Sequence, residues 1–120
     1  MIEYLTLEDV LRLIEDLQVG PIRDVGLLGS AVRRPQAMVF GVDAYPKIDQ
    51  KAAVLLESLV RNPALIDGNN RVGWLATVVF YGLNDMELEA PDDEGYDLVT
   101  SVASRSITYQ EAAEHLARRH

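Results

Sequence analysis

The chain has 120 residues, a length that predicts a single domain spanning residues 1–120. Its hydrophobic content of 48% is sufficient for one core, and the lack of cysteine excludes disulfides and thiolate sites. The net charge of −8 disfavours binding to nucleic acid. With no signal peptide and no apolar run long enough for a membrane span, we expect a cytoplasmic protein with no membrane partner.

Helices and one irregular segment are expected in the N-terminal part of the chain. Thr6 can cap a helix that extends through Leu17, because apolar residues recur on one face. Asp24 can cap a second helix over residues 25–33. Residues 34–47 contain two prolines, a glycine and a short β-like run, which predicts a loop or a small β-hairpin flap.

Two long helices are expected in the middle of the chain. Asp49 can cap the first, from residue 50 to about residue 62, and Pro63 ends it because a proline disfavours helical geometry in the residue before it. The second, from about residue 70 to residue 83, is apolar nearly all round, which is typical of the centre of a bundle.

The C-terminal part predicts two more helices. Asp92 or Asp93 can cap one that extends to about Ser104, and Thr108 with Glu111 forms a capping box for the last. The expected fold class is therefore all-α, a compact helical bundle with a small β-hairpin flap.

The segment that joins the two central helices carries the most chemistry. Gly68 allows a tight turn, and Asn69 tolerates left-handed backbone geometry and can cap the following helix. Arg71 can present a bidentate fork to a phosphate at the helix N-terminus, and Asp67 offers an oxygen ligand for Mg²⁺. The same residues are also ordinary turn chemistry with a solvated arginine, so spacing alone leaves both interpretations open.

This segment resembles the active-site loop of the Fic/Doc family. The family signature is His-x-Phe-x-Asp/Ala-Gly/Ala-Asn-Lys/Gly-Arg, and residues 67–71 match its second half as Asp-Gly-Asn-Asn-Arg. Leu65 stands at the apolar anchor position, the flanking helices match, and Arg34-Pro35-Gln36 is similar to the start of the family's flap. The resemblance covers nearly the whole chain, and its small size is closest to the death-on-curing (Doc) toxins.

The resemblance implies a function and a set of partners. Family members transfer AMP, or in Doc toxins a phosphate, from a nucleotide such as ATP with Mg²⁺ to a protein hydroxyl, and the target of Doc toxins is elongation factor Tu. By the same resemblance Gly68, Asn69, Asn70 and Arg71 form the phosphate site, Asp67 is associated with Mg²⁺, and Arg71 counts among the catalytic residues. A small antitoxin protein is the implied partner, bound as a helix in a groove.

Two positions depart from the family pattern. Pro63 occupies the position of the general-base histidine, and it has no side-chain base. General-base catalysis contributes about 10²–10⁴-fold, so transfer should be severely impaired. Asn70 replaces the usual lysine or glycine and carries no charge.

Other residues have a functional and a structural interpretation. Phe40 and Tyr45 can hold a target segment in extended form or pack the flap onto the bundle. His115 is expected on the surface or in packing, and His120 is expected to be disordered as the terminal residue. Trp74 is expected in the core, and the expected places of Arg33 and Arg34 are the entrance of the site or the solvent.

Three functional hypotheses follow, in this order. The first is a Doc-like toxin whose transfer activity is weak or absent because of Pro63. The second is a catalytically dead Fic-fold module that only binds or regulates a partner. The third is a Fic-type transferase with relocated chemistry.

Overall fold

The computed structural model describes residues 1–120 and forms an α-helical bundle with one small hairpin. The elements are α1 (Leu7–Leu17), α2 (Val25–Arg33), the 3-10 helix η1 (Arg34–Gln36), β1 (Met38–Val39), β2 (Val42–Asp43), α3 (Ile48–Arg61), α4 (Asn69–Leu83), α5 (Asp92–Ala103) and α6 (Tyr109–Ala117). The all-α fold with a small hairpin is therefore confirmed. None of its helices is long and apolar enough to cross a membrane.

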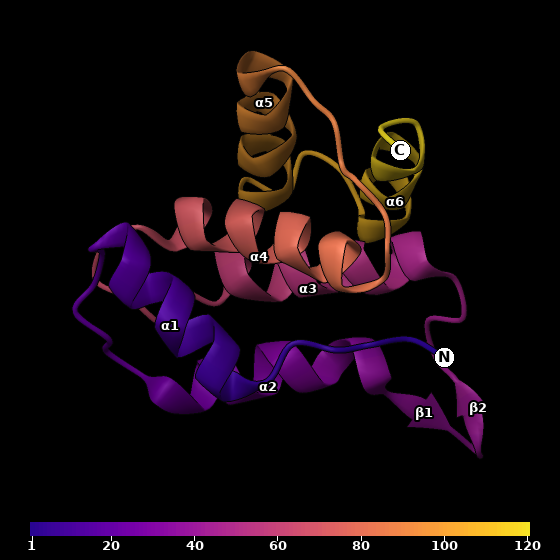
Figure 1. The fold of residues 1–120 in the computed structure, drawn as a ribbon, viewed down its shortest axis with the longest axis horizontal. Helices are drawn as coiled ribbons and strands as arrows, with labels where there is room; N and C mark the ends of the chain where they lie inside the picture. The colour runs from indigo at the N-terminus through magenta and orange to yellow at the C-terminus, as the bar shows by residue number, and fades with distance from the viewer.

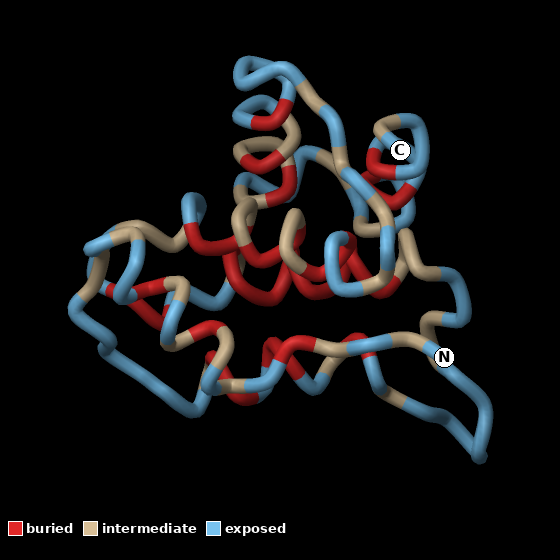
Figure 2. Tube along the Cα trace, viewed as in Figure 1, coloured by how far each residue is buried: buried red, intermediate tan, exposed pale blue.

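Helices α3 and α4 lie side by side in the centre of the molecule (Figure 1). The pair α1 and α2 packs on one side of them, and α5 and α6 pack on the other. Buried residues concentrate along the central pair (Figure 2), and every residue of α3 from Lys51 to Val60 is buried. The sequence predicted a place at the centre of the bundle for the apolar helix α4, which contacts α1, α3 and α5.

The helix N-termini agree with the sequence at α1, α2 and α6 and differ at α3, α4 and α5. Thr6 and Thr108 form capping boxes, and Asp24 accepts a hydrogen bond from the backbone N–H of Gly26. The caps expected from acidic residues are wrong at α3 and α5. Lys47 is the N-cap of α3 and Pro91 that of α5, so that Asp49, Asp92 and Asp93 all lie in first helical turns. The positive end of a helix dipole favours acids throughout the first turn, so local sequence does not separate these positions.

A polar network connects the two halves of the bundle. Glu57 accepts hydrogen bonds from Arg34 at 2.6 Å and from Arg61 at 2.8 Å. Arg61 also donates to the carbonyl oxygens of Val102 at 2.6 Å and Ile107 at 2.7 Å. Arg34 is therefore held by hydrogen bonds and only partly exposed.

Candidate functional site

The loop that joins α3 to α4 is held by the segment that joins α1 to α2. Four backbone hydrogen bonds connect them: Gly20 N to Asp67 O at 3.1 Å, Ile66 N to Pro21 O at 3.0 Å, Arg23 N to Ala64 O at 2.7 Å and Asp24 N to Ala64 O at 3.1 Å. Ile22 and Leu65 form an isolated antiparallel bridge within this pairing. The loop is thus fixed by backbone contacts that no local sequence pattern indicates.

Gly68 is the N-cap of α4 and has a positive φ of 95°. A Cβ at this position would lie 2.4 Å from Cβ of Val19, so only glycine fits without a shift. The cap expected at Asn69 is therefore wrong. The Asn69 side chain turns back instead, accepting from Leu65 N–H at 3.0 Å and donating to Leu65 O at 2.9 Å. These two bonds join the start of the loop at Leu65 to Asn69, the first residue of α4.

The N-terminus of α4 is open to a ligand. The first amide of α4 with an acceptor in the chain is that of Val72, which bonds to Gly68 O at 3.0 Å. No side chain caps the amides before it, those of residues 69–71. These amides border a cleft of about 300 Å³ that is lined by residues 66–71, in which the side chains of Asp67, Asn70 and Arg71 are exposed. Free amides, a helix dipole and an arginine together suit a phosphate group.

The cleft alone does not provide a complete cation site. The structure has no group of three or more histidine, cysteine, aspartate or glutamate residues that could hold a metal. Asp67 is the one carboxylate that lines the cleft. Mg²⁺ keeps several waters and binds through one or two carboxylates together with substrate phosphates, so Asp67 fits an ion that arrives with a nucleotide.

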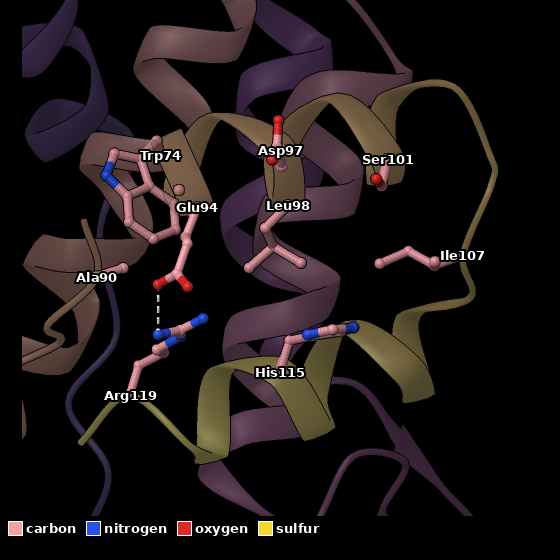
Figure 3. Close-up of a pocket in the computed structure, with 10 residues that line it drawn as sticks. Trp74, Ala90, Glu94, Asp97, Leu98, Ser101, Ile107, His115 and Arg119 are labelled. Atoms are coloured by element: carbon pink, nitrogen blue, oxygen red, sulfur yellow. Dashed lines mark ion pairs between the residues drawn. The ribbon is translucent and has the colours of Figure 1, made fainter. Parts of the chain in front are cut away.

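Neither histidine lies in the cleft. His115 is exposed and lines a separate pocket of about 210 Å³ between α5 and α6, beside the ion pair of Arg119 and Glu94 (Figure 3). The disorder expected at His120 is wrong. Its Nε2 lies 2.7 Å from Oδ1 of Asp49, and its ring centroid lies 5.1 Å from that of Tyr81. The aspartate and the tyrosine hold the ring in place.

The two flap residues differ in their freedom to meet a partner. Phe40 is fully exposed at the tip of the hairpin, with a positive φ of 51°. Tyr45 follows β2 and packs edge-on against Tyr109, with the two ring centroids 5.4 Å apart. Its hydroxyl accepts a hydrogen bond from Nε of Arg34 at 3.3 Å. Phe40 is therefore available for contact, while Tyr45 anchors the base of the hairpin. Contact of either residue with a target stays a prediction.

Trp74 is half-buried rather than fully in the core. Its ring packs against Gly95 of α5, where a Cβ would lie 3.1 Å from the indole. It lines the pocket of His115 and also an apolar groove of about 400 Å³ between α4 and α5. The groove shares Asn70 and Arg71 with the cleft at residues 66–71.

Sequence comparison supplies the family. A sequence model described as the Fic/DOC family matches residues 4–81, which include the loop and both central helices up to Tyr81. The chain belongs to the Fic/DOC family. It is also 47% identical to a protein named Toxin Doc from Mycolicibacterium smegmatis, over 121 residues that cover 98% of this chain and 93% of that protein.

The Fic/DOC signature can now be placed on the geometry. Asp67, Gly68, Asn69, Asn70 and Arg71 lie together at the N-terminus of α4, as their spacing indicated. Asn69 uses its side-chain oxygen and one N–H of its side-chain amide within the loop, while its backbone N–H has no acceptor in the chain. Whether these residues bind phosphate stays a prediction.

The residue at the histidine position of the family, Pro63, is exposed, and its carbonyl oxygen accepts a hydrogen bond from a guanidinium nitrogen of Arg23. No acid or base side chain lies at this point of the loop. Arg23 lies 40 positions away along the chain, and no sequence pattern identified it. The same holds for Val19, which packs against Gly68. The Gly-Pro pair that follows Val19 was the only local signal of a turn there.

Proposed function

We propose that this chain is the toxin of a toxin–antitoxin pair, built on a scaffold that transfers a phosphate or AMP from a nucleotide to a protein hydroxyl. The observation that carries the proposal is the 47% identity to Toxin Doc over 98% of the chain. The open cleft at residues 66–71 supports it, because a toxin of this kind needs a nucleotide site and the cleft suits phosphates.

Each residue of the cleft has a role in this proposal. The amides of residues 69–71 and the guanidinium of Arg71 bind the phosphates, while Asn70 adds a neutral donor. Asp67 binds the Mg²⁺ that accompanies ATP or a related nucleotide. The bound nucleotide supplies the group to be transferred. The chain orients that group through the fixed loop, and Phe40 with Tyr45 guides the acceptor polypeptide, for which elongation factor Tu is the candidate by family resemblance.

The activity of the chain is impaired at Pro63 in this proposal. The acceptor hydroxyl must lose a proton as it attacks, and Asp67, the one carboxylate of the cleft, is assigned to Mg²⁺ in this proposal. Neither histidine can replace this base, because both lie outside the cleft. His115 lines the pocket between α5 and α6, and His120 is bonded to Asp49. A second candidate function, a Fic-fold module that binds a partner without transfer, is favoured by Pro63 itself, which offers no side-chain base at this position.

The proposed antitoxin partner binds as a helix in an apolar groove. The groove between α4 and α5 is a candidate, because its walls include Leu17 at the end of α1 as well as Leu75 and Val99. The exposed Tyr96 lies at the same groove and offers an aromatic contact. A cytoplasmic location follows from a cytoplasmic target.

Growth of a bacterial host tests the proposal. The chain is induced beside the double variant Pro63→His/Asn70→Lys and the matched control Pro63→Asn/Asn70→Lys, which carries an amide in place of the base. Growth arrest by the histidine variant alone is the expected result. Arrest by the unchanged chain would support a transferase with relocated chemistry. If none of the three soluble proteins arrests growth, the binding module becomes the better account.

A further inference from the structure

A second pocket lies between α2 and α3, outside the cleft of residues 66–71. It has a volume of about 360 Å³ and is lined by Leu27, Ser30, Ala31, Arg34, Ser58 and Asn62. Asn62 directly precedes Pro63 in the chain, and Arg34 is bonded to Tyr45 at the base of the hairpin. The pocket therefore adjoins both the position of the missing base and the flap.

The charges beside this pocket do not balance. Arg34 and Arg61 share one carboxylate, that of Glu57, so the cluster carries one positive charge in excess. The side chains of Arg61 and Glu57 are 13% and 12% exposed, whereas that of Arg34 is 30% exposed. The excess charge is therefore accessible at Arg34, and a partly buried charge of this kind favours an anion nearby.

Donors without an acceptor line the same pocket. Arg34 uses Nε for Tyr45 and Nη1 for Glu57 and Ser58, which leaves Nη2 with no hydrogen bond in the chain. Ser30 and Asn62 also line the pocket, and the structure shows no hydrogen bond from either side chain. Burial lowers the pKa of Arg34, but its bonds to Glu57 and Tyr45 outweigh this and raise it overall, so the guanidinium stays charged.

We propose that this pocket binds the side-chain carboxylate of an acidic residue on a polypeptide partner. One negative charge balances the excess of one positive charge, whereas a phosphate dianion would reverse it. Leu27 and Ala31 provide an apolar wall against which the methylene groups of a glutamate can pack. Because the pocket adjoins position 63, the partner is the polypeptide whose hydroxyl is presented there, and this last step rests on the proposed function.

Titration of the full chain with N-acetyl-glutamate N-methylamide, followed by amide and arginine NMR signals, tests the pocket directly. We expect saturable shifts at Ser30, Arg34, Ser58 and Asn62, and no such shifts with the glutamine analogue, which has the same shape without the charge. Equal responses to the two compounds would overturn the proposal. Stronger binding of inorganic phosphate would overturn the choice of a carboxylate, and equally strong binding of acetate would overturn the choice of a polypeptide side chain.

A matched pair of variants locates the binding. Ser30 is exposed on α2, so Ser30→Asp and Ser30→Asn should both fold, and they differ by one charge. The aspartate competes with the ligand for Arg34, so Ser30→Asp should bind the glutamate compound about tenfold more weakly than Ser30→Asn, which keeps a neutral hydrogen-bond donor. Equal affinity of both variants would place the binding elsewhere. The titration contains no nucleotide, so a lack of transfer activity would count against the proposed function and leave the pocket standing.

Discussion

The N-termini of α4 and α6 differ in whether a side chain accepts hydrogen bonds from the backbone N–H groups of the first turn. At α6, Thr108 accepts from the N–H of Glu111 at 3.1 Å, and Glu111 accepts from the N–H of Thr108 at 3.0 Å. At α4, Gly68 has no side chain, Asn69 is bonded to Leu65, and no side chain caps the helix. The first terminus is completed within the chain, and the second is held rigid while its donors remain free. Free donors at a helix N-terminus suit an anion, so α4 is the candidate for ligand binding and α6 is not, and binding at α4 stays a prediction.

The largest expected effect comes from Gly68→Ala, which disturbs the open terminus. The new Cβ would lie 2.4 Å from Cβ of Val19, and φ is 95°. Left-handed strain and overpacking together should lower the free energy of unfolding by about 3 kcal/mol. Urea unfolding measures the change. The control is Gly82→Ala, also at α4 but with nothing within 4 Å of its Cβ, which should be neutral or stabilise by about 0.5–1 kcal/mol. Equal effects at both glycines would contradict the strain argument.

Asn69→Ala should have the next largest effect, because it opens the loop before α4. It removes the two hydrogen bonds to Leu65 and leaves that backbone pair unsatisfied in a buried residue. We expect a loss of about 2 kcal/mol in urea unfolding. Asn70→Ala is the matched control, since Asn70 is exposed and should change stability little. A small loss at Asn69 would mean that the pairing with residues 20–24 is sufficient to hold the loop.

At the closed terminus, Thr108→Ala should cost about 1 kcal/mol, the usual value for loss of an N-cap side chain. Thermal or urea unfolding measures it, and Thr108→Ser, which keeps the hydroxyl, should retain most of the stability. The variant should leave phosphate binding at α4 unchanged. Weaker phosphate binding on loss of this cap would show that the two termini are not independent.

The same contrast explains what the sequence can predict. The capping box at Thr108 lies within four residues, so local pattern is sufficient, and the boundaries of α1 and α2 were likewise predicted. The turn residues and the apolar run after them placed residues 67–71 together at a helix N-terminus, and family resemblance supplied their roles. The role of Asn69 needed the closure of the loop, and the contact of Arg23 with Pro63 spans 40 positions. His120 reaches Asp49 across 71 positions, so only the folded chain reveals that it is held.

The smallest effect on stability, and the sharpest on binding, is expected from Arg71→Gln. Arg71 is exposed and forms no ion pair, so the urea midpoint should not change. A charge-assisted bond to phosphate is worth about 1.5–3 kcal/mol, so the affinity for Mg-ATP measured by calorimetry should fall at least about tenfold. Arg118→Gln, at the far end of α6, removes the same charge outside the cleft and should leave the affinity unchanged. Equal losses from both variants would mean that net charge governs nucleotide affinity. In that case the free amides of α4 would be an uncapped terminus without a ligand, and the contrast with α6 would have no functional meaning.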